Sequence, residues 1–387
     1  KAIFLIIAVT IGIISPSWSQ DEKLEKVHSI IKVFKEYEWY AKQFELWGEE
    51  LKKNKKDADG WVNYYAAARM AKLMTTDEAE KEKWNNKMQL VTEGIEKNIR
   101  KTYEYYYIKA WDSSIWQAKG EEEEKRIASY AINAYNLDPN RADVYPDLIN
   151  YYVVKGKTVK LKEIATKWRK SGDISPNILA INYNMLMSTE RNSILITCGD
   201  NDTYPALVLQ NAENIRTDVT VINIYMAAFS AEFRNNVFRS IGIPELNGTD
   251  LEQMAIINHI ITNKGDLPLY FGFGNYFSEH EALKDQLYNV GMAMRYSETD
   301  FNNTSILINN FENKFLIDQL KFSCFKDPFP EQVKRHNMTY IPGLMMLYEH
   351  YTLMENEKKM MDTKQLITTI VVNTSYEETI NSYFSNK

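Results

Sequence analysis

Two aspartates separated by one residue, Asp200 and Asp202, follow an apolar run that has the pattern of a buried strand. The segment Gly199–Pro205 therefore lies at the carboxyl end of a predicted strand, where open α/β sheets bind their ligands. Carboxylate oxygens are the ligands that hard divalent cations prefer, and a tyrosine ring can support a sugar. The segment predicts a site for a divalent cation or a hydroxyl-rich ligand, and its candidate residues are Asp200, Asn201, Asp202, Thr203 and Tyr204.

Phosphate fits this segment less well, because two carboxylates already occupy the predicted start of a helix and no Lys or Arg is present. For a metal, Asp200 and Asp202 are the candidate ligands, and a divalent cation is the one cofactor that the residues suggest. A second loop, Phe271–Asn275, follows the third predicted strand and could approach the first. Asn275 is therefore a further candidate ligand-binding residue.

The same residues also suit a purely structural role. Asp and Asn side chains bond to their own backbone in turns, Thr203 is a good helix N-cap, and Pro205 suits a first helical turn. The chain has no Gly-x-Ser-x-Gly elbow, Walker loop, HExxH or CxxC motif, and its five histidines are scattered. A non-enzymatic protein is therefore expected more than an enzyme, although the sequence leaves both open.

A small α/β module over residues 192–300 would position this site. Ser193–Cys198 and Val219–Ile224 predict two strands around a helix at Ala206–Asn214, which is a βαβ unit with parallel strands. Two further strands are predicted at Leu267–Gly272 and Asn289–Arg295. We therefore expect a Rossmann-like parallel sheet.

Residues 20–191 predict helices that stack as hairpins. The segment Ala134–Gly156 resembles the junction between two tetratricopeptide repeats, and Trp61 repeats the place of Tyr145. The two residues are 145 − 61 = 84 positions apart, which is not a multiple of the roughly 34-residue repeat, so the array is irregular. Both aromatic residues are expected to be buried against the second helix of their hairpins. The concave side of such arrays commonly binds a peptide or a protein.

The expected fold class is mainly α with an α/β module, built from irregular tetratricopeptide-like hairpins and a small Rossmann-like parallel sheet. The expected division is a signal peptide at 1–19, a helical domain at 20–191, the α/β module at 192–300 and a carboxyl-terminal helical region at 301–387. Tyr340–Leu353 and Met360–Val372 predict a further hairpin in the last region.

Several segments resemble the soluble carboxyl-terminal region of bacterial membrane proteins related to protein O-mannosyltransferases. The resemblance rests on Asn192–Pro205, Leu209-Gln210, Ile215–Asn223 and Leu287–Arg295. The multispan membrane half of those proteins, where a lipid-linked sugar would be transferred, is not part of this sequence, so the resemblance does not imply transferase activity. It implies an α/β module paired with tetratricopeptide-type helices on the outer side of an inner membrane.

The net charge, the cysteine content and the amino-terminal segment limit which partners and which cellular compartment are expected. The net charge is −6 and basic residues lie beside acidic ones, so nucleic acid is not an expected partner. The two cysteines, Cys198 and Cys324, are too few for a disulfide scaffold, and whether they pair stays open. One lysine, a short apolar run and Ser17-Trp18-Ser19 predict a signal peptide cleaved before Gln20 or Asp21. No integral membrane span is expected after its removal, which indicates the periplasm or cell envelope of a Gram-negative bacterium.

The sequence is compatible with three functions. The preferred one is an exported binding or scaffold protein, in which the helices hold a protein or peptide partner and the α/β module binds a glycan or an accessory ligand. The second is a glycan-acting or metal-assisted enzyme that uses Asp200 and Asp202, or an accessory to a membrane glycosyltransferase. The third is a structural subunit of an envelope or secretion complex.

Overall fold

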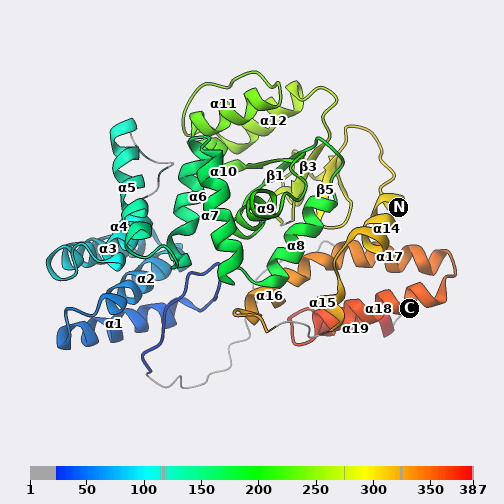
Figure 1. Ribbon diagram of the computed structural model, residues 1–387. Coiled ribbons are helices and arrows are strands. Elements are labelled where there is room, and N and C mark those ends of the chain that lie inside the picture. The colour runs from blue at the N-terminus through cyan, green and yellow to red at the C-terminus, as the bar shows by residue number, and fades with distance from the viewer. Residues whose placement is uncertain are drawn as a thin grey trace.

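The computed structural model describes residues 23–113, 115, 118, 120–273, 275–322 and 326–385. Within them the chain is mainly helical and has one small sheet near its centre (Figure 1). The predicted signal peptide at 1–19 lies outside the described residues. So does Cys324, and the structure therefore does not address its pairing with Cys198.

The amino-terminal helices form the first part of the predicted helical array. They are α1 (Tyr37–Lys53), α2 (Ala58–Met74), α3 (Glu78–Asn98), α4 (Tyr103–Asp112) and α5 (Glu121–Leu137). Each packs against the next where the turn between them is short, as α1 does with α2 and α2 with α3. Asp57 and Asp77 cap α2 and α3 by accepting backbone N–H groups of the first turn, which fixes where these helices begin.

A second set of helices continues the array toward the sheet: α6 (Tyr145–Val154), α7 (Thr158–Ser171) and α8 (Pro176–Met187). A short 3-10 turn, Ala142–Val144, precedes α6. Trp61 on α2 lies over Gly94 of α3, and Tyr145 on α6 packs edge-on against Trp168 of α7, at 6.5 Å between ring centroids. Both are buried, so the prediction that each aromatic residue packs against the next helix of its hairpin is confirmed.

The sheet has five strands in the order β2-β1-β3-β5-β4. The strands are β1 (Ile194–Thr197), β2 (Thr220–Asn223), β3 (Leu269–Gly272), β4 (Leu287–Asn289) and β5 (Ala293–Tyr296). β1 pairs in parallel with both β2 and β3, as the predicted βαβ unit requires. The single strand predicted at Asn289–Arg295 is instead a hairpin, which turns at Gly291 (φ 122°) and pairs antiparallel with β3. The sheet is therefore mixed and not wholly parallel.

Helices cover both faces of the sheet. On one side lie α8 and α9 (Asp200–Glu213), and on the other α10 (Ile224–Phe229), α11 (Ala231–Ser240) and α12 (Gln253–Asn263). Strand side chains alternate between the two cores: Leu195 and Tyr270 point to the first, while Ile196 and Phe271 point to the second. Because both faces are covered, these strands are short continuous apolar runs in the sequence, which is the pattern of a buried strand.

The chain after the sheet is helical, as predicted. A short α13 (Asn275–Ser278) precedes β4, and the elements after β5 are α14 (Thr304–Asn309), a π-helical turn (Asn310–Lys314), α15 (Asp318–Lys321), α16 (Pro330–Asn337), α17 (Ile341–Leu353), α18 (Glu357–Val371) and α19 (Glu377–Ser385). α17 and α18 form the predicted hairpin.

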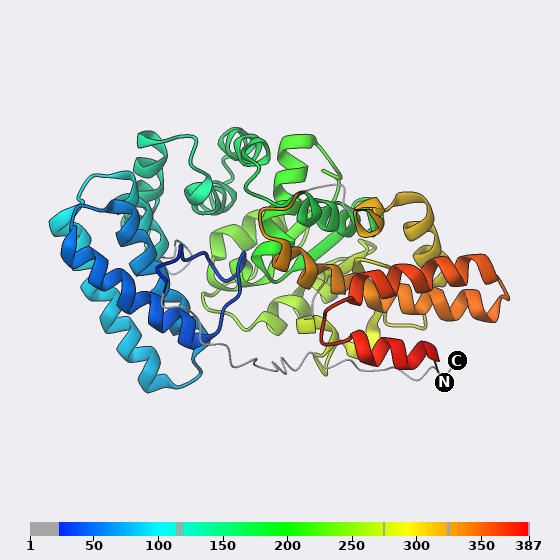
Figure 2. The same ribbon diagram turned by 90° about the horizontal axis from the view of Figure 1, so that it is seen from below.

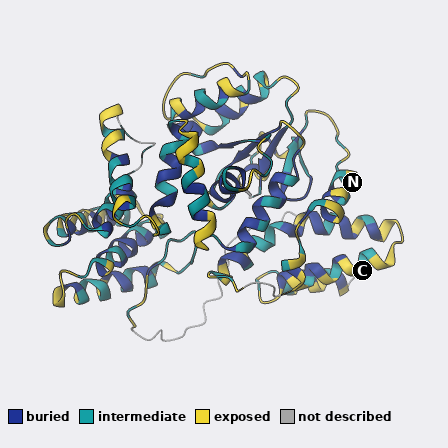
Figure 3. Cartoon of the chain, in the orientation of Figure 1, coloured by how far each residue is buried: buried dark blue, intermediate teal, exposed yellow. Residues whose placement is uncertain are grey.

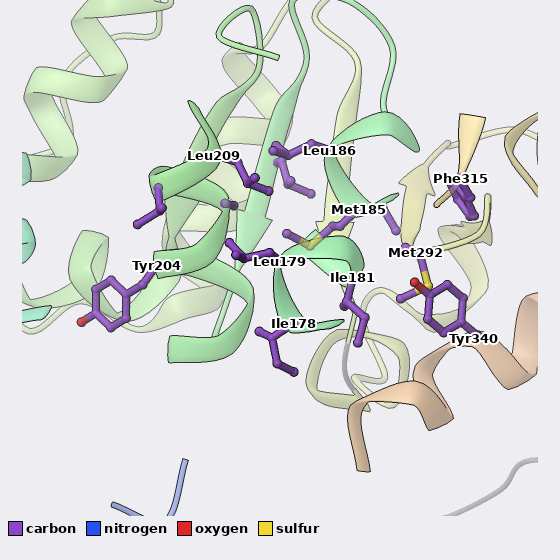
Figure 4. Close-up of a cluster of buried hydrophobic side chains, with 14 of the residues drawn as sticks. Ile178, Leu179, Ile181, Met185, Leu186, Tyr204, Leu209, Met292, Phe315 and Tyr340 are labelled. Carbon is purple, nitrogen blue, oxygen red and sulfur yellow. The ribbon is translucent and has the colours of Figure 1, made fainter. Parts of the chain in front are cut away.

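Buried side chains gather along the sheet and between the helices, and exposed ones lie at the outer helix faces (Figure 3). The largest apolar cluster among the described residues joins the regions predicted at 20–191, 192–300 and 301–387. Figure 4 shows part of it, from Tyr204 on α9 through Leu179 and Met185 of α8 to Phe315 and Tyr340. This shared core holds α6–α9 in place around the carboxyl end of the sheet.

Candidate ligand-binding site

The segment predicted as a turn, Gly199–Pro205, is mostly helix. α9 begins at Asp200, with Gly199 as its N-cap. The expectation that Thr203 caps the helix is therefore wrong. The capping group is Asp202, the third helical residue, whose carboxylate reaches back to the N–H of Gly199 at 2.7 Å.

Asp202 and Thr203 face the sheet, and both make hydrogen bonds within the protein. The second carboxylate oxygen of Asp202 accepts the Cys198 N–H at 3.1 Å, and the side chain is 3% exposed. Burial raises the pKa of Asp202 to about 7, although these backbone donors act in the opposite direction. The Thr203 hydroxyl forms a hydrogen bond with the Thr197 hydroxyl at 2.8 Å and accepts one from the Asn223 amide at 2.9 Å, which connects α9 to β1 and β2.

Pro205 lies inside α9, where it can donate no N–H to the carbonyl of Asn201 four residues earlier. The side-chain amide of Asn182 on α8 takes that place, donating to the Asn201 carbonyl at 2.7 Å. A side chain from a neighbouring helix thus satisfies the backbone group that the proline leaves free.

Asn201 and Tyr204 are also engaged within the protein. The Asn201 amide donates to the carbonyl of Ile31 at 3.2 Å and accepts from Gln332 at 3.0 Å. The Tyr204 hydroxyl donates to Asn150 at 2.9 Å, and its ring is 6% exposed, so little of it is open for a sugar to stack on. For Asn275 the structure describes only its place at the start of α13.

Asp200 points the other way, into a cavity of about 1160 Å³ between the helical array and the carboxyl end of the sheet. The structure therefore separates the two candidate metal ligands, since Asp200 lines this cavity and Asp202 does not. Within the described residues, no group of three His, Cys, Asp or Glu side chains is arranged to hold a metal ion.

Residues far apart in the sequence meet Asp200 in the cavity. Its walls include Arg69 from α2, Trp111 from α4, and Asp147 and Asn150 from α6. Arg69 is held in place because its guanidinium donates to the Trp111 carbonyl at 2.8 Å and lies over the Trp111 ring at 5.3 Å. Arg69 thus adds a fixed cation to a cavity wall that also carries carboxylates and an amide.

Asp147 and Asp200 interact electrostatically across this cavity. Burial raises the pKa of Asp147 to about 7, and the negative charge of Asp200 adds to the rise while Arg69 opposes it. Asp200 is exposed to the cavity, yet the surrounding protein raises its pKa as well, again against the effect of Arg69. Neither carboxylate forms an ion pair with any described residue, although other acids of the wall do, as Asp173 does with Lys32 at 2.5 Å.

The repeated hairpin pattern in the sequence could have identified Asp147 as a residue that faces the cavity. Asp147 lies two residues after Tyr145, as Asn63 lies two residues after Trp61, and both line the cavity. The repeated hairpin pattern therefore predicts one polar, inward-facing position on each first helix. Arg69 and Trp111 carried no comparable signal, because they reach Asp200 only through the packing of α2 and α4.

Comparison with protein families gives one match. Residues 179–240 match the family model described as TMEM260-associated domain 2. The match runs from α8 to the end of α11 and contains Asp200 and Tyr204 but not Arg69, Trp111 or Asp147. No curated protein and no solved structure gave a significant match. The chain thus contains a TMEM260-associated domain within a mostly helical protein.

The described helices also bear on the membrane. None of those in the described ranges has the length and apolar character needed to cross a bilayer.

Proposed function

We propose that this chain is a binding protein, and that the cavity shared by the helical array and the α/β module binds a neutral glycan. The observation that carries this proposal is the meeting of Asp147, Asp200 and Arg69 in one large cavity. Each carboxylate has two oxygens that accept O–H groups and the guanidinium donates N–H groups, so the three side chains complement the vicinal hydroxyls of a sugar.

The dimensions and charge of the cavity support a ligand of this class. Its volume of about 1160 Å³ is larger than that of a usual small-molecule site and suits an oligosaccharide. The cavity is lined by seven Asp or Glu side chains and five Lys or Arg side chains, and this small excess of acids disfavours an anionic ligand. Asn150, which also lines the cavity, adds a short polar group beside Asp147.

We further propose that the protein acts outside the inner membrane, in the periplasm or cell envelope, and that its tetratricopeptide-type helices hold a protein partner. The signal-peptide pattern in residues 1–19 and the resemblance to proteins related to O-mannosyltransferases support this placement. Mass spectrometry of the mature protein should find an amino terminus at Gln20 or Asp21. Retention of residues 1–19 would contradict export with cleavage.

Titration calorimetry with uncharged mannose-based and glucose-based oligosaccharides, and with an acidic oligosaccharide, tests the glycan proposal. We expect binding of at least one uncharged sugar and none of the acidic one. Preference for the acidic sugar, or no binding of any sugar at millimolar concentration, would overturn it.

An enzymatic function is the second candidate, and one observation favours it. Asp147 has a pKa of about 7 and lies within electrostatic range of a second carboxyl group, an arrangement that could supply a general acid and a base for glycosidic bond cleavage. Analysis of the same sugars for reducing ends after incubation separates the two functions, because a binding protein leaves them intact.

A further inference from the structure

The chain segment before α1 crosses the cavity as an extended strap. Residues 24–29, 31 and 32 line the cavity, and the segment runs from the amino-terminal helices toward the central module (Figure 2). We use the name strap for residues 24–32. They form neither helix nor strand, and only a turn at Ser29–Val33 interrupts their extended course.

Amide side chains hold the main chain of the strap and its neighbour Lys23. Gln43 on α1 donates to the carbonyl of Lys23 at 2.9 Å and accepts the N–H of Glu25 at 3.0 Å. One amide side chain thus makes both bonds that a peptide group of an adjacent strand would make. Asn63 on α2 accepts the N–H of Val27 at 2.8 Å, so the contacts recur at every second residue of an extended chain.

The far end of the strap is held in the same way. The carbonyl of Ile31 accepts N–H groups from Gln332 at 2.8 Å and from Asn201 at 3.2 Å. Because these bonds go to the main chain, they would accept many sequences. Two side chains add selectivity: Val27 is 4% exposed, and Lys32 pairs with Asp173 at 2.5 Å.

We propose that this groove is a binding site for an extended segment of a partner polypeptide, and that the strap occupies it until such a segment displaces it. The proposal deepens the protein-partner part of the proposed function and does not depend on the glycan. The preferred segment carries an aliphatic residue at the Val27 position and a basic residue five positions later, opposite Asp173. A partner bound in this way would lie along the cavity wall and could present an attached group to Asp147 and Asp200.

Displacement is feasible because the strap is not part of a backbone hydrogen-bonding ladder. A segment of another polypeptide must still compete with the tethered strap. Its apparent affinity is therefore its intrinsic affinity multiplied by the fraction of chains whose groove is open. Weakening the strap should therefore tighten binding of a free peptide without any change in the groove itself.

The test uses the full chain and a fluorescent peptide with the sequence of residues 23–34. We expect weak binding to the wild type and at least about tenfold tighter binding to a chain with Val27→Asp and Lys32→Glu, because its groove is open more of the time. Adding Asn63→Leu should abolish the gain. Lys35→Glu, which makes the same charge change outside the Asp173 pair, should leave the affinity at the wild-type value.

A peptide that itself carries Val27→Asp and Lys32→Glu should not bind. Failure of the unmodified peptide to bind the strap-weakened chain, while that chain keeps a native circular dichroism spectrum, would overturn the proposal. So would binding that survives Asn63→Leu. Neither result would bear on sugar binding, which is measured separately through Asp147 and Asp200.

Discussion

Asn63 and Asp147 occupy the same position on helices α2 and α6, two residues after the aromatic residue that anchors each hairpin. The anchors match in detail: Trp61 donates to the carbonyl of Lys55 at 3.0 Å, and Tyr145 donates to the carbonyl of Pro139 at 2.8 Å, six residues earlier in both cases. Asn63 accepts an N–H from an extended chain segment in the cavity. We infer that Asp147, at the equivalent position, accepts donors of a ligand.

The hairpin anchors should be costly to remove. Truncating Tyr145 or Trp61 to Ala should lower the free energy of unfolding by about 3–5 kcal/mol, as for other large buried aromatic residues. Tyr145→Phe should cost only about 0.5–1.5 kcal/mol, because it loses the bond to Pro139 and keeps the packing. Urea denaturation measures both, with Leu137→Ala as an exposed control. Losses below about 1 kcal/mol for the Ala variants would show that the hairpin register is wrong.

Asp202 and Asp200 should respond differently to the same change. Asp202→Asn turns an amide nitrogen toward a backbone N–H donor, so we expect a loss of about 0.5–2 kcal/mol of stability. Asp200→Asn should not lower stability, because its carboxylate caps nothing and faces the cavity, and its raised pKa means that its charge does not stabilise the fold. Thermal melts of the two variants decide this. Equal losses would mean that Asp200 also has a structural role.

The stability of the protein should depend on pH through Asp147. Its pKa is raised to about 7 in the folded chain, so between about pH 4 and 7 the folded state holds a proton that the unfolded state has released. The stability that this bound proton contributes is fully present below the ordinary pKa of an Asp side chain, and it is lost as the pH rises toward the folded pKa of about 7. Asp147→Asn should therefore be more stable than the wild type by about 1–3 kcal/mol at about pH 8.5, and equal to it at about pH 4.

Urea denaturation at both pH values measures this effect, with the exposed Asp300→Asn as the matched control. A less stable Asp147→Asn at the higher pH would contradict the buried-charge explanation.

Asn182 and Pro205 should be coupled. Asn182→Leu leaves the carbonyl of Asn201 without its donor and should cost about 1–3 kcal/mol. Pro205→Ala restores an N–H four residues after Asn201, so in the Asn182→Leu background it should recover about 1 kcal/mol. A double-mutant cycle measures the coupling and removes the separate effect of the Asn182 bond to Ile178. Additive changes would show that the proline does not explain the position of Asn182.

Local patterns predicted much of the fold. The apolar run at Ile194–Thr197 and the pattern around Tyr145 are local features of the sequence, so the strand and the hairpin could be predicted from them. The start of α9 was missed because Asp, Asn and Thr suit turns as well as first helical turns, and only the contact between Asp202 and Gly199 decides between them. The β4–β5 hairpin was missed because Gly291 divides a run that is apolar on both sides.

The cavity could not be predicted from local patterns. Asp200 was a candidate because it follows a strand, but its neighbours Arg69 and Trp111 belong to helices much earlier in the chain. Whether Asp200 or Asp202 faces the cavity depends on the capping bond of Asp202, which turns that side chain away from it. The sequence thus identified the correct helix end for a cavity-facing acid without showing which other residues face it.

The most direct test of the central claim is to titrate the tightest-binding uncharged oligosaccharide into four proteins by calorimetry: the wild type, Asp147→Asn, Asp200→Asn and the exposed control Asp300→Asn. If the cavity holds the glycan, each cavity variant should bind at least about tenfold more weakly, a loss of about 1.4 kcal/mol, while Asp300→Asn matches the wild type. Wild-type affinity in both cavity variants would contradict the claim and place any glycan site elsewhere on the protein.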